Sequence, residues 1–256
     1  MFYGAILMKK LIGYIGLAAI LAMCSSSRGW ADTFDPLDAF KTNLADGFLK
    51  PFAADLGGLI GGADFSSGRT VGFPGFDVGA VGMIQAKPDK DNLILKNAKV
   101  KAFGLGLLQG SVALPFLGAD LAVRGVNYSN LSIIGGGIRY PLFRSGTLTK
   151  FIPDVSVSAF YDAVDFKYFT GRHLSADVAA SFDLPFIKPF AGIGYDRTRV
   201  EITGVSADFN GMDAIVAKPR YTVGARIVPF PFLYVFGAYT LLHSQHGFNF
   251  GAGARF

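Results

Sequence analysis

The last eleven residues of the chain alternate strictly in character. Apolar side chains occupy every second position, namely Phe248, Phe250, Ala252, Ala254 and Phe256, and small or polar residues fill the positions between them, namely Gly247, Asn249, Gly251, Gly253 and Arg255. Successive side chains of a β-strand point to opposite faces, so this pattern predicts a strand with one apolar face. The stretch has about the length of a tilted strand that crosses a bilayer, roughly 9–11 residues.

The terminal phenylalanine of this strand resembles the assembly signal of bacterial outer-membrane β-barrels, with Phe248, Phe250 and Phe256 as its aromatic residues. The resemblance implies the bacterial cell outer membrane as location, and outer-membrane lipid and the barrel assembly machinery as partners. It names no substrate.

The other end of the chain predicts export. Met8-Lys9-Lys10 is followed by an apolar run from Leu11 to Met23 and then by small residues up to Ala31. A basic start, a short apolar core and a small-residue site are typical of a secretory signal peptide, here residues 1–31 with cleavage between Ala31 and Asp32. The alternative is a lipoprotein with Cys24 as the lipidated residue, although Met23 stands where that motif requires a small residue.

Composition excludes several functional classes. Cys24 is the only cysteine, so a mature chain without residues 1–31 has neither disulfides nor thiolate chemistry. The formal charge is +5, and removing Lys9, Lys10 and Arg28 leaves 21 basic residues against 19 acidic ones. This small excess and the lack of a basic run argue against a nucleic-acid partner. We expect no cofactor, no metal and a monomer.

The same alternation recurs after about residue 74 and predicts ten strands. Their expected ranges are 74–85, 99–113, 118–127, 131–142, 154–165, 172–183, 190–202, 217–228, 232–242 and 246–256. A soluble β-sandwich has the same period. The signal peptide, the terminal phenylalanine and the placement of aromatic residues favour a closed antiparallel transmembrane β-barrel of about ten strands, with 8 to 12 as the range.

Turn lengths orient this barrel. The C-terminus of such barrels is periplasmic, so alternate connections are short periplasmic turns. Three of them, 114–118, 184–189 and 228–231, combine proline with phenylalanine, which suits strand ends and an aromatic girdle at the membrane interface. The connection 145–153 falls on the same side. The opposite, outward set comprises 86–98, 128–130, 166–171, 203–216 and 243–245.

Residues 32–72 precede the predicted barrel and do not alternate. Leu37, Phe40, Leu44 and Phe48 recur at helical spacing, and we expect Pro51 to end or kink this helix. Two positions suit it. The favoured one is a periplasmic amphipathic helix over the barrel mouth, and the other is a plug inside the lumen. The domains are therefore 1–31, 32–72 and 73–256.

A family resemblance rests on the same region. Phe40 to Phe52, the run Asp55-Leu-Gly-Gly-Leu-Ile-Gly-Gly62 and the strand start Gly75-Phe-Asp-Val78 resemble a family of uncharacterised outer-membrane proteins of Bacteroidetes-like bacteria. The resemblance covers about the first third of the mature chain and implies no activity for particular residues.

Charged residues on the inward side of the predicted strands are the candidate lumen lining. They are Asp77, Asp120, Arg124, Arg139, Asp154, Asp162, Asp177, Arg220, Arg226 and Arg255. One interpretation is a paired network that fills a polar core, since buried charges need partners. The other is the lining of a narrow pore, with space left by inward glycines such as Gly135, Gly137, Gly192, Gly194, Gly224, Gly251 and Gly253.

Outer-membrane hydrolases are the rival functional class, because some have this size. Lipid A deacylases use a His-x-Ser pair, and His173-Leu174-Ser175 has that spacing, with Asp177 on the same face. Other ten-stranded proteases use His and Asp at the outer rim, where His243 and His246 lie, with Asp162, Asp165 and Asp196 as further acids. We favour a passive role: a narrow channel, a carrier for small or apolar solutes, or a structural membrane component.

Overall fold

Ten strands form the body of the molecule. The computed structural model describes residues 40–43, 48–128, 130–146 and 151–256; the predicted signal peptide, its cleavage site, Cys24, Leu37 and Leu44 lie outside this part. The strands are β1 (Phe76–Gln85), β2 (Phe103–Ala113), β3 (Asp120–Tyr128), β4 (Leu131–Phe143), β5 (Asp154–Phe166), β6 (Phe169–Ser181), β7 (Ile187–Ile202), β8 (Asp213–Phe230), β9 (Leu233–Leu242) and β10 (Gln245–Arg255). The helices are α2 (Phe40–Asn43), α3 (Leu49–Gly62) and α4 (Leu93–Asn97).

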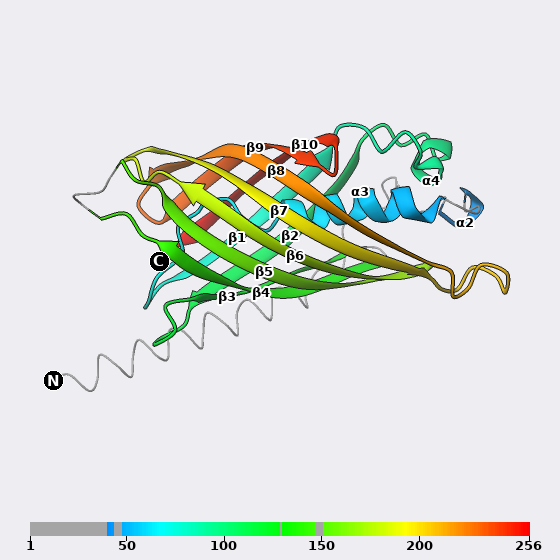
Figure 1. Ribbon diagram of the computed structural model, residues 1–256, viewed down its shortest axis with the longest axis horizontal. Helices are drawn as coiled ribbons and strands as arrows, with labels where there is room; N and C mark the ends of the chain where they lie inside the picture. The colour runs from blue at the N-terminus through cyan, green and yellow to red at the C-terminus, as the bar shows by residue number, and fades with distance from the viewer. Residues whose placement is uncertain (1–39, 44–47, 129, 147–150) are drawn as a thin grey trace.

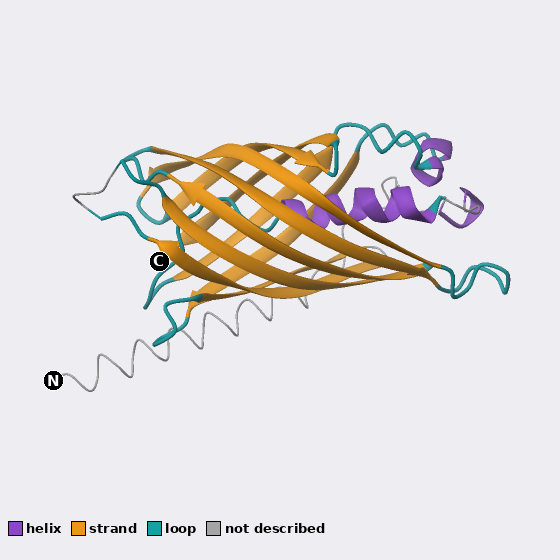
Figure 2. Cartoon of the chain, viewed as in Figure 1, coloured by secondary structure: helices purple, strands orange, loops and turns teal. Residues whose placement is uncertain are grey.

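The strands close into one antiparallel barrel, in which each pairs with its neighbours in sequence and β1 pairs with β10 (Figures 1 and 2). At the closing seam Asp77 lies opposite Arg255 and Gln85 opposite Gly247. Closure leaves no unpaired strand edge, as a lipid environment requires. The expected closed ten-strand barrel is confirmed, and alternation located each strand to within a few residues.

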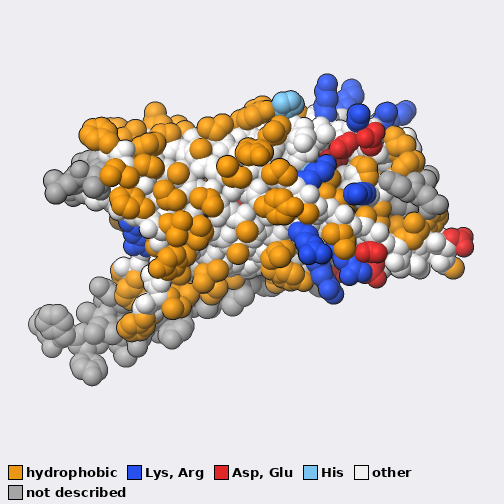
Figure 3. All heavy atoms as spheres, viewed as in Figure 1, with side chains coloured by type: hydrophobic (Ala, Val, Ile, Leu, Met, Phe, Trp, Pro, Cys, Tyr) orange, Lys and Arg blue, Asp and Glu red, His pale blue; other side chains and the backbone are white. Residues whose placement is uncertain are grey.

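The two sides of the wall differ in chemistry. On β6, Arg172, Leu174 and Val178 point outward and are exposed, while His173 and Asp177 point inward and are buried. Figure 3 shows apolar side chains spread over the barrel wall, with charged side chains near the loop end. An apolar outer wall around a polar interior is the architecture of transmembrane barrels of the bacterial outer membrane.

The ring of the C-terminal residue, Phe256, packs against aromatic residues at one end of the barrel. Phe256 stacks on Phe76 at a ring-centroid distance of 4.9 Å and on Phe232 at 5.4 Å. Phe116, Phe186 and Phe230 in the short turns of this end are exposed. They suit the periplasmic aromatic girdle predicted for these turns.

Two local expectations are wrong. The strand expected from residue 99 begins at Phe103, because residues 86–102 form a connection that contains α4. Pro51 does not end a helix but lies in the first turn of α3, where the missing N–H is not needed. The glycine-rich run 57–62, which alone disfavours a helix, completes α3. Within the described residues, no helix has the length and apolarity to cross a membrane.

Candidate functional site: a plugged lumen

Helix α3 lies inside the barrel. All of its residues except Lys50 and Pro51 are buried, which is typical of a helix surrounded on every side. It contacts β8 and β7 most extensively, and Figure 1 shows it extending into the barrel from the end opposite the C-terminus. The favoured expectation of a periplasmic helix over the mouth is therefore wrong, and the alternative of a plug describes the structure. We call residues 49–72 the plug.

Glycines let the helix approach the wall. A Cβ added to Gly58 would lie 3.1 Å from the Leu242 Cβ, and one added to Gly61 would lie 2.6 Å from Asp196 Oδ2. Contacts under 3.0 Å force a neighbour to move. The run of glycines that costs helix propensity thus removes the side chains that the narrow lumen has no room for.

An aromatic cluster closes the loop end of the lumen. Phe52 of α3 packs against Phe40 at 5.1 Å and Phe169 at 5.2 Å, and Phe166 packs against Phe169 at 5.1 Å. Because Phe166 and Phe169 flank the β5–β6 turn, which belongs to the predicted outward set, the first residues of the plug lie at the end of the barrel predicted to face outward. The chain then descends through the lumen to β1, which starts at the periplasmic end.

Asp55 ties the plug to the first outward loop. Its carboxylate accepts hydrogen bonds from Gln85 Nε2 at 2.6 Å, Asn92 Nδ2 at 2.6 Å and the Asp89 backbone N–H at 2.9 Å. A buried carboxylate with several donors satisfies its lone pairs without a cationic partner. The contacts hold residues 86–92 over the helix.

Asp64, just beyond α3, bridges opposite walls of the barrel. It accepts from Arg124 Nη1 of β3 and from Arg220 Nη2 of β8, each at 2.6 Å. Arg124 also holds Asp162 in a two-pronged pair, with both N–O distances at 2.7 Å. The side chains of Asp64, Arg124 and Asp162 are 0 % exposed. Charge-assisted bonds of this geometry are strong, so Asp64 is the main polar anchor of the plug.

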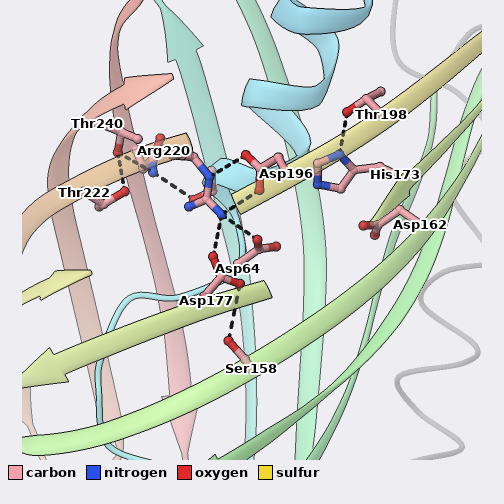
Figure 4. Close-up of polar contacts among 12 residues, drawn as sticks. Asp64, Ser158, Asp162, His173, Asp177, Asp196, Thr198, Arg220, Thr222 and Thr240 are labelled. Atoms are coloured by element: carbon pink, nitrogen blue, oxygen red, sulfur yellow. Dashed lines mark hydrogen bonds and ion pairs between the residues drawn. The ribbon is translucent and has the colours of Figure 1, made fainter. Parts of the chain in front are cut away.

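We call the ion pairs that surround Asp64, including those of Arg124 and Arg220, the upper charge layer, and Arg220 is its second centre (Figure 4). Beside Asp64 it donates to Asp177 Oδ1 at 2.7 Å and to Asp196 Oδ2 at 3.0 Å. Asp196 Oδ2 also lies 2.9 Å from His243 Nε2, while His243 Nδ1 lies 2.7 Å from the Ala54 carbonyl oxygen. His243 therefore lies between a carboxylate of the wall and a backbone carbonyl of the helix, and it links α3 to the wall.

A lower charge layer lies nearer the periplasm. Asp77 accepts from Arg255 Nε and from the Tyr234 hydroxyl, each at 2.7 Å, and Arg226 lies 3.9 Å away. Arg139 donates to the Asp64 carbonyl oxygen at 2.6 Å. The plug thus meets arginines in both layers.

The cavities that remain are small. One of about 140 Å³ opens at the periplasmic mouth between Arg69, Asp154, Lys188 and Arg226, and one of about 20 Å³ lies beside Asp77 and Arg139. The inward glycines do not leave a pore. A Cβ on Gly192 would lie 2.5 Å from the Phe65 ring, and one on Gly251 would lie 2.5 Å from the Phe236 ring. Large neighbouring side chains occupy the space that these glycines provide.

The structure places the predicted lining residues on the inward side. Asp77, Asp120, Arg124, Arg139, Asp154, Asp162, Asp177, Arg220 and Arg226 are buried, and the Arg255 side chain is 24 % exposed. Most of them are paired with one another or with the plug. Asp64 and Asp55, which hold the plug, were missed, because an acid outside the alternating strands carries no periodic signal. Their only mark in the sequence is a position beside the glycine-rich run.

The candidate hydrolase residues do not assemble into a catalytic triad. His173 Nδ1 contacts Thr198 Oγ1 at 2.9 Å rather than Ser175, and Asp177 is engaged by Arg220. His173 is 0 % exposed and Ser175 1 % exposed, beneath the plug. Asp196 orients His243 and not His173. Asp165 and His246 lie on the exposed outer side, away from this group.

One group in the described part of the chain has the proximity of metal ligands. Asp64, His173 and Asp196 offer ligand atoms that lie within 4.8 Å of one another, and His173 Nε2 is buried without a partner. Arg220 contacts both carboxylates, and Arg124 contacts Asp64. These guanidinium groups repel a cation at the same place. The arrangement fits an ion-pair network better than a metal centre, and the expected absence of a metal stays a prediction.

Comparisons with known proteins bear on the fold alone. No family model matches the chain, and no curated protein matches it, so the resemblance to a Bacteroidetes-type family stays a prediction. Solved structures match at low identity. The N-terminal β-barrel domain of OprF from Pseudomonas aeruginosa is 15% identical with a TM-score of 0.33, and the match covers 72% of this chain and 99% of that one.

Two further structures are similar at this level. An outer-membrane channel from Pseudomonas putida F1 is 10% identical with a TM-score of 0.46, over 76% of this chain and 98% of that one. The translocator domain of the autotransporter NalP from Neisseria meningitidis is 11% identical with a TM-score of 0.42, over 83% and 100%. The chain is an outer-membrane β-barrel by its architecture: a closed antiparallel sheet, an apolar outer wall and a charged interior.

Proposed function

We propose that this protein is a narrow channel for small solutes that is closed by its own N-terminal segment. The observation that carries the proposal is the position of the plug, which fills the lumen and lies between walls that carry their own charged lining. Removal of the plug exposes Arg124 and Asp162 on one wall and Arg220, Asp177 and Asp196 on the other. A lining of both signs suits small hydrophilic solutes.

Conduction then requires that the plug moves. The helix has few features that stabilise it outside the barrel, since four of its fourteen residues are glycine and each costs about 1 kcal/mol relative to alanine. Its fixed position depends on the contacts of Asp55, Asp64 and His243 with the wall. A ligand or partner that competes for these contacts shifts the population toward the open state.

A reversible cross-link between plug and wall tests this. The exchanges Gly58→Cys and Leu242→Cys place two Cβ atoms about 3 Å apart, close to the roughly 3.5–4.5 Å of a disulfide. In planar bilayers we expect the unmodified protein to conduct in brief openings. The oxidised double variant should not open, and a reductant should restore the openings. Each single-cysteine variant is the matched control.

Deletion of residues 49–62 gives the complementary result. We expect a continuously open channel with a conductance above that of the unmodified protein. If the deletion variant folds, as judged by a mobility shift on unboiled gels, yet does not conduct, the channel proposal is wrong and a structural role remains. Openings that persist in the oxidised double variant contradict the plug as the gate.

A further inference from the structure

The outer wall carries a group of arginines that the lumen does not explain. Arg172 of β6 and Arg199 of β7 lie directly opposite each other in the strand register. Arg197 lies two residues before Arg199 in β7 and on the same face. All three point outward and are exposed. Like charges directly opposite on neighbouring strands repel each other, and negative charge close to them relieves this repulsion. We call these three residues the arginine group.

Its depth in the membrane is defined by the residues around it. Toward the periplasm, the outward positions next to the group are Leu174 and Tyr195, with exposed fractions of 51 % and 57 %, and apolar residues follow. Toward the loops, the next outward positions are Thr170 and Glu201. The group therefore lies where the apolar band ends at the loop end of the barrel. Figure 3 shows basic side chains at this border on the visible face.

The acids of the region satisfy only one of the three arginines. Arg199 pairs with Asp213 at 3.0 Å and with Glu201 at 3.5 Å. Neither Arg172 nor Arg197 has an acidic partner within ion-pair distance among the described residues. An unpaired guanidinium on a lipid-facing wall is costly at the middle of the membrane, about 2–4 kcal/mol, and nearly free at the interface. Their cost disappears where lipid phosphates lie at the same level.

A hollow on the wall adjoins the group. It has a volume of about 320 Å³, and Arg172, Arg199 and Thr170 line it together with Ile134 and Ala163. Two carboxylates, Asp165 and Glu201, also line it, and Glu201 is paired with Arg199. Arg197 lies outside this lining, two positions from Arg199 on the same face of β7. Guanidinium and hydroxyl donors beside an apolar strip match a phosphorylated sugar headgroup with an acyl chain below it. Arginine binds phosphate through two parallel hydrogen bonds, which adds geometric selectivity.

We propose that the arginine group is a binding site for a phosphorylated saccharolipid of the outer leaflet. Arg172 and Arg197 contact a phosphate of the headgroup, Arg199 stays paired with its acids and shapes the site, and an acyl chain lies along Ile134 and Ala163. The site faces the outer leaflet because the loop end is opposite the periplasmic C-terminus. The proposal is independent of whether the lumen conducts.

The test uses a bisphosphorylated glucosamine disaccharide lipid and the same lipid without phosphates. The delipidated full-length protein in mild detergent is titrated with each, and binding is measured by native mass spectrometry. We expect the phosphorylated lipid to bind with one tight site and the dephosphorylated lipid to bind at least about tenfold more weakly. Added salt should weaken only the first interaction.

Variants locate the site. Arg172→Ala with Arg197→Ala should weaken binding of the phosphorylated lipid about tenfold. Lys90→Ala with Lys96→Ala removes the same charge from the first outward loop and should leave binding unchanged. Arg172→Lys with Arg197→Lys retains the charge but not the two-pronged geometry, and should bind with intermediate strength. A mobility shift on unboiled gels confirms that each variant is folded.

Three outcomes overturn the proposal. In one, the double alanine variant binds the phosphorylated lipid as tightly as the unmodified protein does. In another, the loop variant loses as much binding as the double alanine variant, which would make the effect one of net charge. In the third, the two lipids bind the unmodified protein equally well, so that the phosphate is not recognised.

Discussion

Single residues decide how the lumen is closed. Asp64 belongs to no strand and lies just beyond α3, yet it joins Arg124 and Arg220 from opposite walls at 2.6 Å each. Both arginines have other carboxylates, so the wall stays paired when the plug leaves. Asp64, in contrast, exchanges two guanidinium partners for water. Arg124 and Arg220 therefore hold the plug through Asp64, while their pairing with the acids of the wall does not depend on the plug.

Asp64→Asn tests this residue. The amide keeps the size but loses the charge, so both arginines lose a partner in a buried place. Breaking a buried ion pair lowers the free energy of unfolding by about 3–5 kcal/mol. This figure is an upper limit here, because Arg124 and Arg220 keep other carboxylate partners. We expect the urea midpoint of unfolding to fall and channel openings to last longer. Asp91→Asn, on an exposed loop, is the control, and an equal effect of both variants would contradict the role of Asp64.

At the scale of elements, the close fit of α3 is the main structural requirement. Its glycine face touches Thr198, Asp196 and Leu242, side chains that are themselves buried and held by neighbours. A helix with larger side chains at these positions has no space in a ten-strand barrel, because inward side chains nearly fill the interior of the barrel. The close approach of the barrel wall therefore requires the glycines of α3, whereas helix propensity alone disfavours them.

Gly61→Val tests the fit of the helix. Its Cβ would lie 2.6 Å from Asp196 Oδ2 and 2.8 Å from Arg220 Nε, both fixed in the upper charge layer. Overpacking of this kind costs about 1–3 kcal/mol. The temperature at which the folded band disappears on unboiled gels should fall. Gly237→Ala is the matched control, because nothing lies within 4 Å of its added Cβ. An unchanged temperature for Gly61→Val would show that α3 is not tightly seated.

Sequence predicts the elements of this protein unequally. Alternation predicts β5 and β10 to within a residue or so, because a one-residue slip would turn every apolar side chain toward the lumen. Helix α3 has no such signal. Its glycines and Pro51 argue locally against a helix, and only the surrounding wall makes it stable. Alternation along each strand predicts which charges point inward. It does not predict which of them pair, because the partners of Asp196 depend on which strands meet across the lumen.

On the scale of the whole molecule, the chain passes through its own barrel. Phe40 packs on Phe169 at the loop end, while Phe76 stacks on Phe256 at the periplasmic end. Helix α2 therefore lies at the loop end, which the predicted orientation of the barrel places outside the cell.

Labelling of intact cells tests this orientation. Lys41 of α2 is exposed, so Lys41→Cys should react with a maleimide reagent that does not cross membranes. Lys188→Cys, at the periplasmic mouth, should react only after permeabilisation. Cys24 is the only native cysteine, and the unmodified protein gives the background. Reaction of Lys41→Cys only after permeabilisation would reverse the threading described above.

The threading also restricts which way the gate can travel. Withdrawal of α3 toward the C-terminal end of the barrel would have to draw Phe40, which packs on Phe52 and Phe169 at the loop end, down the lumen, whereas release toward the loops would not. Residues 63–75 then act as a leash, with a span of roughly 40 Å when extended. In the proposed channel, we therefore expect the gate to respond to agents at the loop end of the barrel rather than to pulling from the opposite end. The leash keeps a released helix at a high local concentration beside the mouth, which favours its rebinding in the lumen.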